Sequence, residues 1–422
     1  MPAERTFLVT VQLDPRFSRG RSHWSLEDEA QELQELATSA AGRVVGDLQA
    51  RRHEPVAGTF LGQGKLEDIA AAAQAAQAQV VIFNQELSPA QQRNIEDLLR
   101  VKTIDRTQLI LDIFAQRAKS QEGKVQVELA QLRYLLPRLT GKGIMLSRLG
   151  GGIGTRGPGE QKLEVDRRRI RARISRLSDE LSRLARRREA TRARRKETQV
   201  PVAALVGYTN AGKTTLLNRL TGPSGTAKNQ LFTTLDPLAR RLRLPGGESL
   251  ILTDTVGFLH HLPHHLIEAF KATLEEARDA DVLLHVLDAS HRLVSEHATA
   301  VEEVLHELQL GMKPVVTVLN KCDTMDDSQR AGALAQAYQP AVAVSAKTGE
   351  GLPQLLAVLA VQLGLGAAAV IRLRIPQARA DVLAALYRAG QVLSRMDSDG
   401  AVELTARLSA PQQAAFSAYL LS

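Results

Sequence analysis

A glycine-rich stretch near the middle of the chain has the residue types and spacing of a phosphate-binding loop. A short apolar run at residues 202–206 leads into Gly207, and four residues later come Gly212, Lys213 and Thr214, followed by a helical pattern. Glycines let consecutive backbone N–H groups converge on phosphate oxygens, and the start of a helix adds a favourable dipole. In such a loop the lysine reaches the β and γ phosphates and the threonine hydroxyl ligates Mg²⁺. The predicted contacts come from Gly207, Tyr208, Thr209, Asn210, Ala211, Gly212, Lys213, Thr214 and Thr215.

Further motifs follow in the order and approximate spacing that a nucleotide switch requires. The pair Thr233 and Thr234 comes first, and three polar motifs then begin at Asp254, Asn320 and Ser345. Each of these three follows an apolar run, so we expect it at the carboxyl end of a strand, where open α/β sheets bind ligands. A single glycine-rich loop is also compatible with a plain turn before a helix, whereas four motifs in this order favour a nucleotide site. Their predicted nucleotide contacts are Thr233, Thr234, Asp254, Thr255, Val256, Gly257, Asn320, Lys321, Asp323, Ser345, Ala346 and Lys347.

The motif at residues 320–323 predicts the base. The carboxylate of Asp323 can accept hydrogen bonds from both N1–H and the exocyclic amine of guanine, a pair of donors that adenine does not offer. The motif that begins at Ser345 would direct a backbone N–H toward the guanine carbonyl. We therefore expect GTP and GDP as ligands and ATP as the weaker substrate.

The expected reaction is attack of water on the γ phosphate, catalysed mainly by positioning and by charge stabilisation. Mg²⁺ would be held directly by Thr214, by a switch threonine when the triphosphate is bound, and by Asp254 through water. Lys213 and the N–H of Gly257 would contact the γ phosphate, and Gly257 would move when that phosphate leaves. The motifs thus predict a Mg²⁺-dependent GTPase that acts as a switch.

Phe258 stands where many such switches carry a glutamine that orients the attacking water. An apolar ring cannot orient water by hydrogen bonding. We therefore predict slow intrinsic turnover that rises when a partner orders the site.

Two other groups of side chains allow more than one interpretation. Asn210, inside the phosphate loop, is a candidate ligand for a monovalent cation such as K⁺, and its alternative role is a hydrogen bond that stabilises the loop. Four histidines follow the second switch motif, at His260, His261, His264 and His265. With no nearby cysteine, and with Pro263 interrupting a regular helix, a mobile switch surface is favoured over a zinc site.

Charge is concentrated in one segment of the 422-residue chain. The net charge is +8, yet residues 162–196 hold fifteen Lys or Arg against five Asp or Glu, an excess of +10. The rest of the chain therefore sums to about −2, so a polyanionic partner is predicted for this segment. A solvated, charged coiled hairpin is the alternative, but too few acids accompany the arginines for i,i+4 pairing. Structured RNA is favoured over DNA, because a long arm with a loop at its tip suits RNA and the chain has no recognisable module for reading a DNA groove. The arm has few aromatic residues, so contacts to phosphate and to RNA shape should dominate over base stacking.

The pattern of apolar residues predicts an α/β protein with several domains. Strands and helices alternate up to residue 106, and two helices with apolar seams then flank a glycine-rich loop at residues 140–160. The second helix would extend roughly 45–50 Å. We predict an N-terminal α/β domain (residues 1–106), a helical hairpin arm (107–198), a central Ras-like P-loop GTPase domain (199–364) and a small C-terminal α+β domain (365–422). The last should contain strands at 370–375 and 401–408 and helices at 381–396 and 411–421.

The single cysteine, Cys322, permits no intramolecular disulfide and indicates a reducing compartment. Residues 351–371 carry no charge over nearly the length of a membrane span, but prolines, glycines and glutamines interrupt them. We predict a soluble helix plus linker there, with no membrane span.

The chain resembles the HflX GTPases of the Obg/HflX group over nearly its whole length. The resemblance is carried by residues 60–66, 86–93, 105–114 and 147–160, the last reading SRLGGGIGTRGPGE and being highly specific to the family. Residues 232–237 look like the family's first switch, which adds Phe232 to the nucleotide contacts and implies that Thr234 is the magnesium-sensing, catalytic threonine. Gln161 and His260 depart from the residues usual in the family.

The resemblance implies that a cytoplasmic monomer binds the large (50S) ribosomal subunit and its rRNA and separates stalled or idle 70S ribosomes under stress. Peripheral attachment to a membrane is the alternative location. Two other functions stay open: an RNA-remodelling nucleotidase acting in ribosome biogenesis, and a non-enzymatic RNA-binding scaffold with GTP as a structural ligand.

Overall fold

The computed structural model describes most of the chain, in two compact units. The described residues are 3–14, 16–17, 24–139, 158–197, 200–222, 232, 238–259, 271–325, 328–365, 369–398, 400–408 and 410–421. The first unit comprises Met1–Arg194 with Lys228–Asp236 and Val256–Leu274, and the second comprises Arg195–Ala227, Pro237–Thr255 and Glu275–Ser422.

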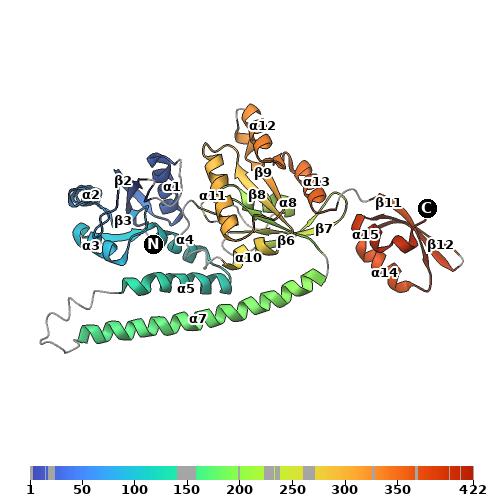
Figure 1. Cartoon of the computed structure of the whole chain (residues 1–422), viewed down its shortest axis with the longest axis horizontal. Helices are drawn as coiled ribbons and strands as arrows, with labels where there is room; N and C mark the ends of the chain where they lie inside the picture. Colours follow the sequence, from blue (N-terminus) through green and yellow to red (C-terminus); the bar gives the residue numbers. More distant parts are fainter. Residues whose placement is uncertain are drawn as a thin grey trace. The chain divides into compact units, whose positions relative to one another are not determined.

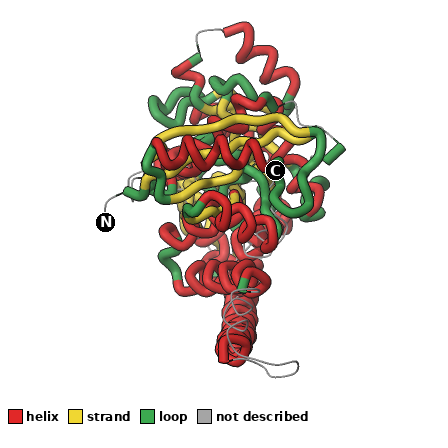
Figure 2. Tube along the Cα trace, turned by 90° about the vertical axis from the view of Figure 1, so that its left-hand side faces the viewer, coloured by secondary structure: helices red, strands yellow, loops and turns green. Residues whose placement is uncertain are grey.

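The first unit contains a four-stranded parallel sheet in the order β2-β1-β3-β4 (Figures 1 and 2). Its strands are β1 (Arg5–Leu13), β2 (Arg43–Arg52), β3 (Val80–Phe83) and β4 (Lys102–Asp105). The connecting helices are α1 (Leu26–Ser39), α2 (Gln63–Ala75) and α3 (Pro89–Leu99), with α4 (Arg106–Arg117) after the last strand. Alternate residues of β1 point to opposite faces, and Phe7, Val9 and Val11 pack with residues of α2 and α3. The predicted N-terminal α/β architecture is confirmed.

Local sequence sets where these helices begin. Ser25 and Ser88 each form a capping box, in which the serine hydroxyl accepts the N–H of the residue three positions later and that residue's side chain accepts the serine N–H. Helix α2 begins at Gln63, after Gly62.

The arm consists of α5 (Gln121–Arg138) and α7 (Pro158–Glu197). Val125, Leu129 and Leu177 form its buried seam, and Glu128 accepts two hydrogen bonds from Arg173 across it, at 2.7 and 2.9 Å. Helix α7 has 40 residues and a length of about 60 Å, longer than the predicted 45–50 Å. The prediction was short because the charged ends of the helix carry few apolar residues at helical spacing. Residues 140–157, most of the predicted glycine-rich loop, lie outside the described residues.

Helix α5 is joined to the first sheet by a buried polar cluster at the end of β4. The carboxylate of Asp105 is fully buried and accepts the hydroxyl of Tyr134 at 2.7 Å and the guanidinium of Arg138 at 3.2 Å. Asp105 also caps α4 by accepting the N–H of Gln108 at 2.9 Å. One carboxylate therefore fixes the start of α4 and the end of α5 to the same strand.

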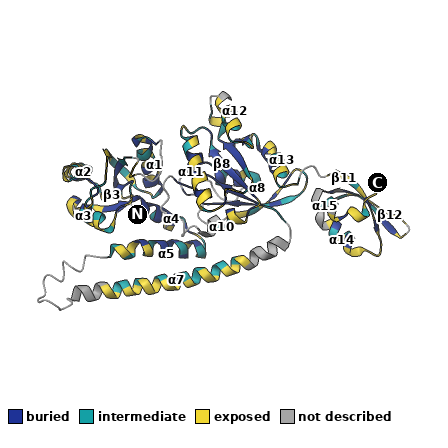
Figure 3. Cartoon of the chain, viewed as in Figure 1, coloured by how far each residue is buried: buried dark blue, intermediate teal, exposed yellow. Residues whose placement is uncertain are grey.

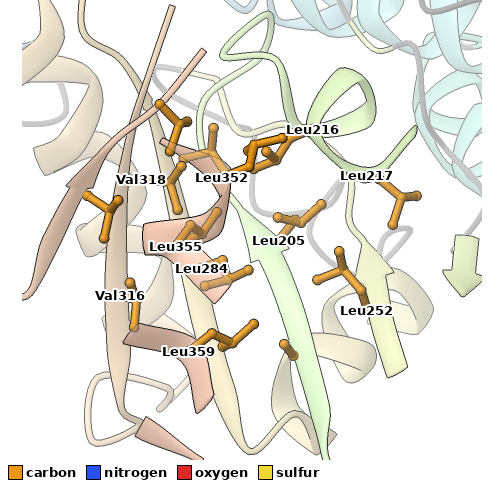
Figure 4. Packing of buried hydrophobic residues seen from close by; sticks show 14 of the residues in the cluster. Leu205, Leu216, Leu217, Leu252, Leu284, Val316, Val318, Leu352, Leu355 and Leu359 are labelled. Atoms are coloured by element: carbon orange, nitrogen blue, oxygen red, sulfur yellow. The ribbon is translucent and has the colours of Figure 1, made fainter. Parts of the chain in front are cut away.

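The second unit contains a six-stranded sheet in the order β10-β9-β8-β5-β7-β6, parallel except for the edge strand β6. The strands are β5 (Val202–Val206), β6 (Leu238–Arg243), β7 (Ser249–Asp254), β8 (Val282–Asp288), β9 (Val315–Asn320) and β10 (Ala341–Ala343). The helices between them are α8 (Lys213–Thr221), α10 (Lys271–Asp279), α11 (Val294–Glu307), α12 (Ser328–Ala337) and α13 (Leu352–Gln362), with a 3₁₀ turn at Cys322–Thr324. Leucines of α8 and α13 pack on Leu205, Leu284 and Val318 of the strands on one face (Figure 4). Residues of α11 and α12 pack with Leu287 and Leu319 on the other face.

A three-stranded antiparallel sheet, in the order β11-β13-β12, follows at the C-terminal end. Its elements are β11 (Ala369–Pro376), α14 (Ala380–Ala389), β12 (Gln391–Ser398), β13 (Ala401–Leu408), α15 (Ala410–Ala415) and a 3₁₀ turn at Ser417–Tyr419. The helix predicted at 381–396 is wrong in its second half, because α14 ends at Ala389, with Gly390 as its C-cap, and the following residues pair with β13. The helix predicted at 411–421 is shorter than expected. No helix in the described part of the chain is both long enough and apolar enough to cross a membrane.

Candidate nucleotide-binding site

The phosphate loop runs from the end of β5 into α8, as the sequence predicted, and at two of its glycines neighbouring atoms leave no room for a Cβ. Gly207 has φ +152°, and a Cβ added there would overlap the backbone carbonyl of Val286. Gly212 has φ +94°, and a Cβ there would overlap the side-chain amide of Asn320. That amide instead donates to the carbonyl of Ala211 at 2.8 Å. The motif at residues 320–323 therefore touches the loop, and a larger residue at Gly212 would push the two apart, whereas one at Gly207 would push the loop away from β8.

Lys213 is buried at the start of α8. Its ammonium donates to the carbonyls of Gly207 at 2.9 Å and Tyr208 at 2.8 Å. Burial lowers the pKa of Lys213 to about 8, and the carboxylate of Asp254 opposes this shift. A bound phosphate would supply negative charge that compensates the positive charge of the buried ammonium.

Thr214 and Asp254 meet beside the loop. The hydroxyl of Thr214 donates to the carboxylate of Asp254 at 2.7 Å, and Asp254 is the fully buried last residue of β7. Hydroxyl, carboxylate and phosphate oxygens are the ligands that Mg²⁺ prefers, so this donor set fits the predicted cation. Among the described residues, no group of three or more His, Cys, Asp or Glu is arranged to hold a metal ion. The histidines at 260, 261, 264 and 265 lie outside those residues.

The base motif is held by two side-chain contacts with the loop after β10. Asn320 accepts the N–H of Ala346 at 3.0 Å, and Asp323 accepts the hydroxyl of Ser345 at 2.7 Å. Asp323 is exposed, and the bond from Ser345 orients its carboxylate. This is the arrangement that presents carboxylate oxygens to a pair of N–H donors, as guanine recognition requires.

His285 is buried in β8, close to the lysine of the phosphate loop. Burial lowers its pKa to about 4, and the charge of Lys213 contributes to the same shift. The imidazole is therefore neutral at physiological pH and adds no second positive charge near Lys213.

The other predicted site residues are placed as follows. Thr255 is buried and its hydroxyl donates to the carbonyl of Leu205 at 2.7 Å. Asn210 is exposed, with φ +63°, and Lys347 is exposed, while Thr209 is buried and Thr215 is half-buried. Phe232, Val256 and Gly257 are buried and belong to the first unit, where the ring of Phe232 meets Phe114 edge to face at 4.5 Å. Thr233 and Thr234 lie outside the described residues.

Two residues of this region were not singled out from the sequence. Asp288 is the last residue of β8, and its carboxylate accepts a hydrogen bond from the ammonium of Lys321 at 2.6 Å. A carboxylate directly after an apolar run is a sequence signal that could have identified it as a site residue. His297, in α11, stacks on Tyr208. Nothing in its spacing distinguishes it from other helical positions.

Four family models match consecutive parts of the chain. Their descriptions are GTP-binding GTPase N-terminal (residues 27–115), GTP-binding GTPase middle region (117–195), 50S ribosome-binding GTPase (202–321) and HflX C-terminal domain (332–420).

Curated relatives agree with these models. The GTPase HflX of Caldanaerobacter subterraneus is 51% identical over 76% of this chain and 73% of its own. That of Escherichia coli K12 is 44% identical over 90% of each chain. Among solved structures, the complex of SsGBP with GDP covers 85% of this chain and 99% of its own, at 26% identity and a TM-score of 0.48, which is too low to bear on function. The motif order, the loop geometry and the relatives lead to one conclusion, that this chain belongs to the HflX family of GTPases.

Proposed function

We propose that this GTPase is a switch that binds the large ribosomal subunit in its GTP state and dissociates stalled or idle 70S ribosomes under stress. The name of the model that matches residues 202–321, a 50S ribosome-binding GTPase, supports this partner. Such a protein would act as a monomer in the cytoplasm. The proposed cofactors are GTP or GDP with Mg²⁺ on Thr214, Thr234 and, through water, Asp254, with K⁺ beside Asn210.

The observation that carries the ribosomal part of the proposal is the distribution of arginines on α7. The helix is exposed along most of its described length (Figure 3). Its exposed arginines include Arg168, Arg176, Arg183 and Arg186. At 3.6 residues per turn these four fall within a sector of about 80°, opposite to the apolar residues that pack on α5. The arm thus has an apolar side that is covered and a basic side that is open to an RNA backbone.

Within the nucleotide site, Lys213 and Gly257 would stabilise the charge that develops on the γ phosphate, and Thr234 would sense Mg²⁺. The side chain after Gly257 is a buried phenylalanine, Phe258, which offers no hydrogen bond to the attacking water. Hydrolysis by the isolated protein should therefore be slow, and binding of the ribosomal subunit should accelerate it.

Co-sedimentation with 50S subunits tests the switch directly. We expect more protein in the pellet with a non-hydrolysable GTP analogue than with GDP. Equal sedimentation with both nucleotides would contradict the proposal. Hydrolysis of GTP and ATP, assayed with and without subunits, separates the alternatives: equal use of ATP would favour an RNA-remodelling nucleotidase, and no stimulation at all would favour a scaffold with structural GTP.

A matched pair of double variants tests the arm. Arg176→Gln with Arg183→Gln removes two charges from the open side of α7, and Arg372→Gln with Arg374→Gln removes two exposed charges from β11. We expect the first pair to weaken sedimentation and to lower the salt dependence of binding by the equivalent of up to about two phosphate contacts. The second pair should leave the salt dependence unchanged, and an equal effect of both pairs would exclude a specific role of the arm.

A further inference from the structure

The phosphate loop is supported from α11 by a stack of rings that lies outside the sequence motifs. The ring of Tyr208 lies face to face with the imidazole of His297, with ring centroids 3.9 Å apart and planes at 6°. The imidazole of His291 stacks on His297 in turn, at 4.5 Å. Tyr208 and His297 are 5% and 9% exposed, so this contact is packed inside the second unit.

The middle ring of the stack is neutral and fixed in place. Burial, and then the nearby His291, lower the pKa of His297 to about 3, so this imidazole carries no charge at physiological pH. His291 is held in turn, because its Nδ1 accepts the N–H of Leu293 at 3.1 Å. The stack is therefore held at the start of α11, with His297 in the first turns of the helix and His291 in the segment just before it.

The ring of Tyr208 connects this support to the lysine of the loop. The carbonyl of Tyr208 accepts the ammonium of Lys213 at 2.8 Å. The residue before it, Gly207, has no side chain with which to anchor the backbone. The Tyr208 ring is thus a side-chain anchor at this turn of the loop, next to one of the two carbonyls that hold Lys213.

We propose that His297, acting through the ring of Tyr208, is a positioning residue for Lys213 and thereby for the β and γ phosphates. The inference rests on the proposed nucleotide site and assigns a residue outside the loop to it. The contribution of an aromatic stack beyond its buried area, if lost in full from the positioning of Lys213, corresponds to about two- to tenfold weaker nucleotide binding.

The test compares His297→Ala, which removes the ring, with His297→Phe, which keeps a stacking ring without its nitrogen atoms. His306→Ala is the matched control, because His306 is an exposed histidine in the last turn of the same helix. We expect His297→Ala to raise the Kd for GDP and the KM for GTP by about two- to tenfold. His297→Phe should stay within about twofold of the wild type, and His306→Ala should not differ from it. The preference for GTP over xanthosine triphosphate should be unchanged in all three, because Asp323 is not touched.

Two results would overturn the inference. One is a folded His297→Ala variant that binds GDP as the wild type does, and the other is a His297→Phe variant as weak as His297→Ala. Where circular dichroism shows that His297→Ala is not folded, Tyr208→Leu removes the same contact from the other side and must show the same loss. Failure of the wild-type protein to bind GDP at all would instead refute the proposed function.

Discussion

The buried ammonium of Lys213 predicts that nucleotide affinity falls as the pH rises from 7 to 9. Burial lowers the pKa of this lysine to about 8, so the free protein loses the proton in this range. A nucleotide that places phosphates beside the ammonium keeps it charged to a much higher pH. Binding at pH 9 must therefore take up a proton that the free protein has already lost, and this uptake opposes binding.

The magnitude follows from the linkage of protonation and binding. With a pKa of about 8 in the free protein, half of the molecules are charged at pH 8 and about a tenth at pH 9. The apparent Kd for GDP should thus be about twice its neutral-pH value at pH 8 and about tenfold higher at pH 9. The nearest titratable groups do not reproduce this profile. Asp254 is a carboxylate that favours the charged lysine, and His285, with a pKa lowered to about 4, is neutral throughout.

The assay is a titration with a fluorescent GDP analogue between pH 7 and pH 9 at constant ionic strength. Lys213→Arg is the control, because a guanidinium keeps its charge over the whole range and any decline that remains belongs to the guanine base. A flat wild-type profile, or the same decline in Lys213→Arg, would refute the reasoning from the buried ammonium.

Three other substitutions test the site and the arm. Asp323→Asn should shift the preference from GTP toward xanthosine triphosphate, measured as the ratio of kcat/KM values, and an unchanged ratio would remove the basis for assigning the base. Gly207→Ala should abolish GDP binding in equilibrium dialysis, because the added Cβ overlaps the carbonyl of Val286, and retained binding would show that the loop can shift. Leu177→Ala removes a side chain that is 1% exposed in the seam of the arm, and should destabilise the pairing of α5 with α7 by about 2–3 kcal/mol. Hydrogen exchange of the α5 amides measures this loss, and Val165→Ala, an exposed position on α7, is its control.

The phosphate and base motifs were predictable because their chemistry is local in sequence. Gly207, Lys213 and Thr214 stand within eight residues of one another, and Asp254 and Asn320 are each the last residue of a strand, as the preceding apolar runs indicated. The topology of a parallel sheet then brings such strand ends to one edge. Local composition, together with the rule that the carboxyl ends of parallel strands meet at one edge of the sheet, was enough to predict where these motifs lie in the fold.

Contacts between distant side chains were not predictable in the same way. Tyr208 and His297 are 89 positions apart in the sequence, and neither residue type by itself predicts that the two rings stack. The β12 strand was missed because its residues follow a helix without a change in apolar spacing, and they become a strand only by pairing with β13. In both cases the partner, and not the residue itself, decides the structure.

The basic side of α7 gives the strongest reason to look for function outside the nucleotide site. Leucines and an isoleucine form the seam of the arm, and Arg173 joins the two helices through its bidentate pair with Glu128. Arg176 and Arg183 are exposed, and no ion pair involves either of them in the described residues. Like charges on one side of a helix repel one another, so they lower the stability of the isolated arm. A polyanion that neutralised these arginines would remove the repulsion, and this is the physical ground for the proposed contact of the arm with ribosomal RNA.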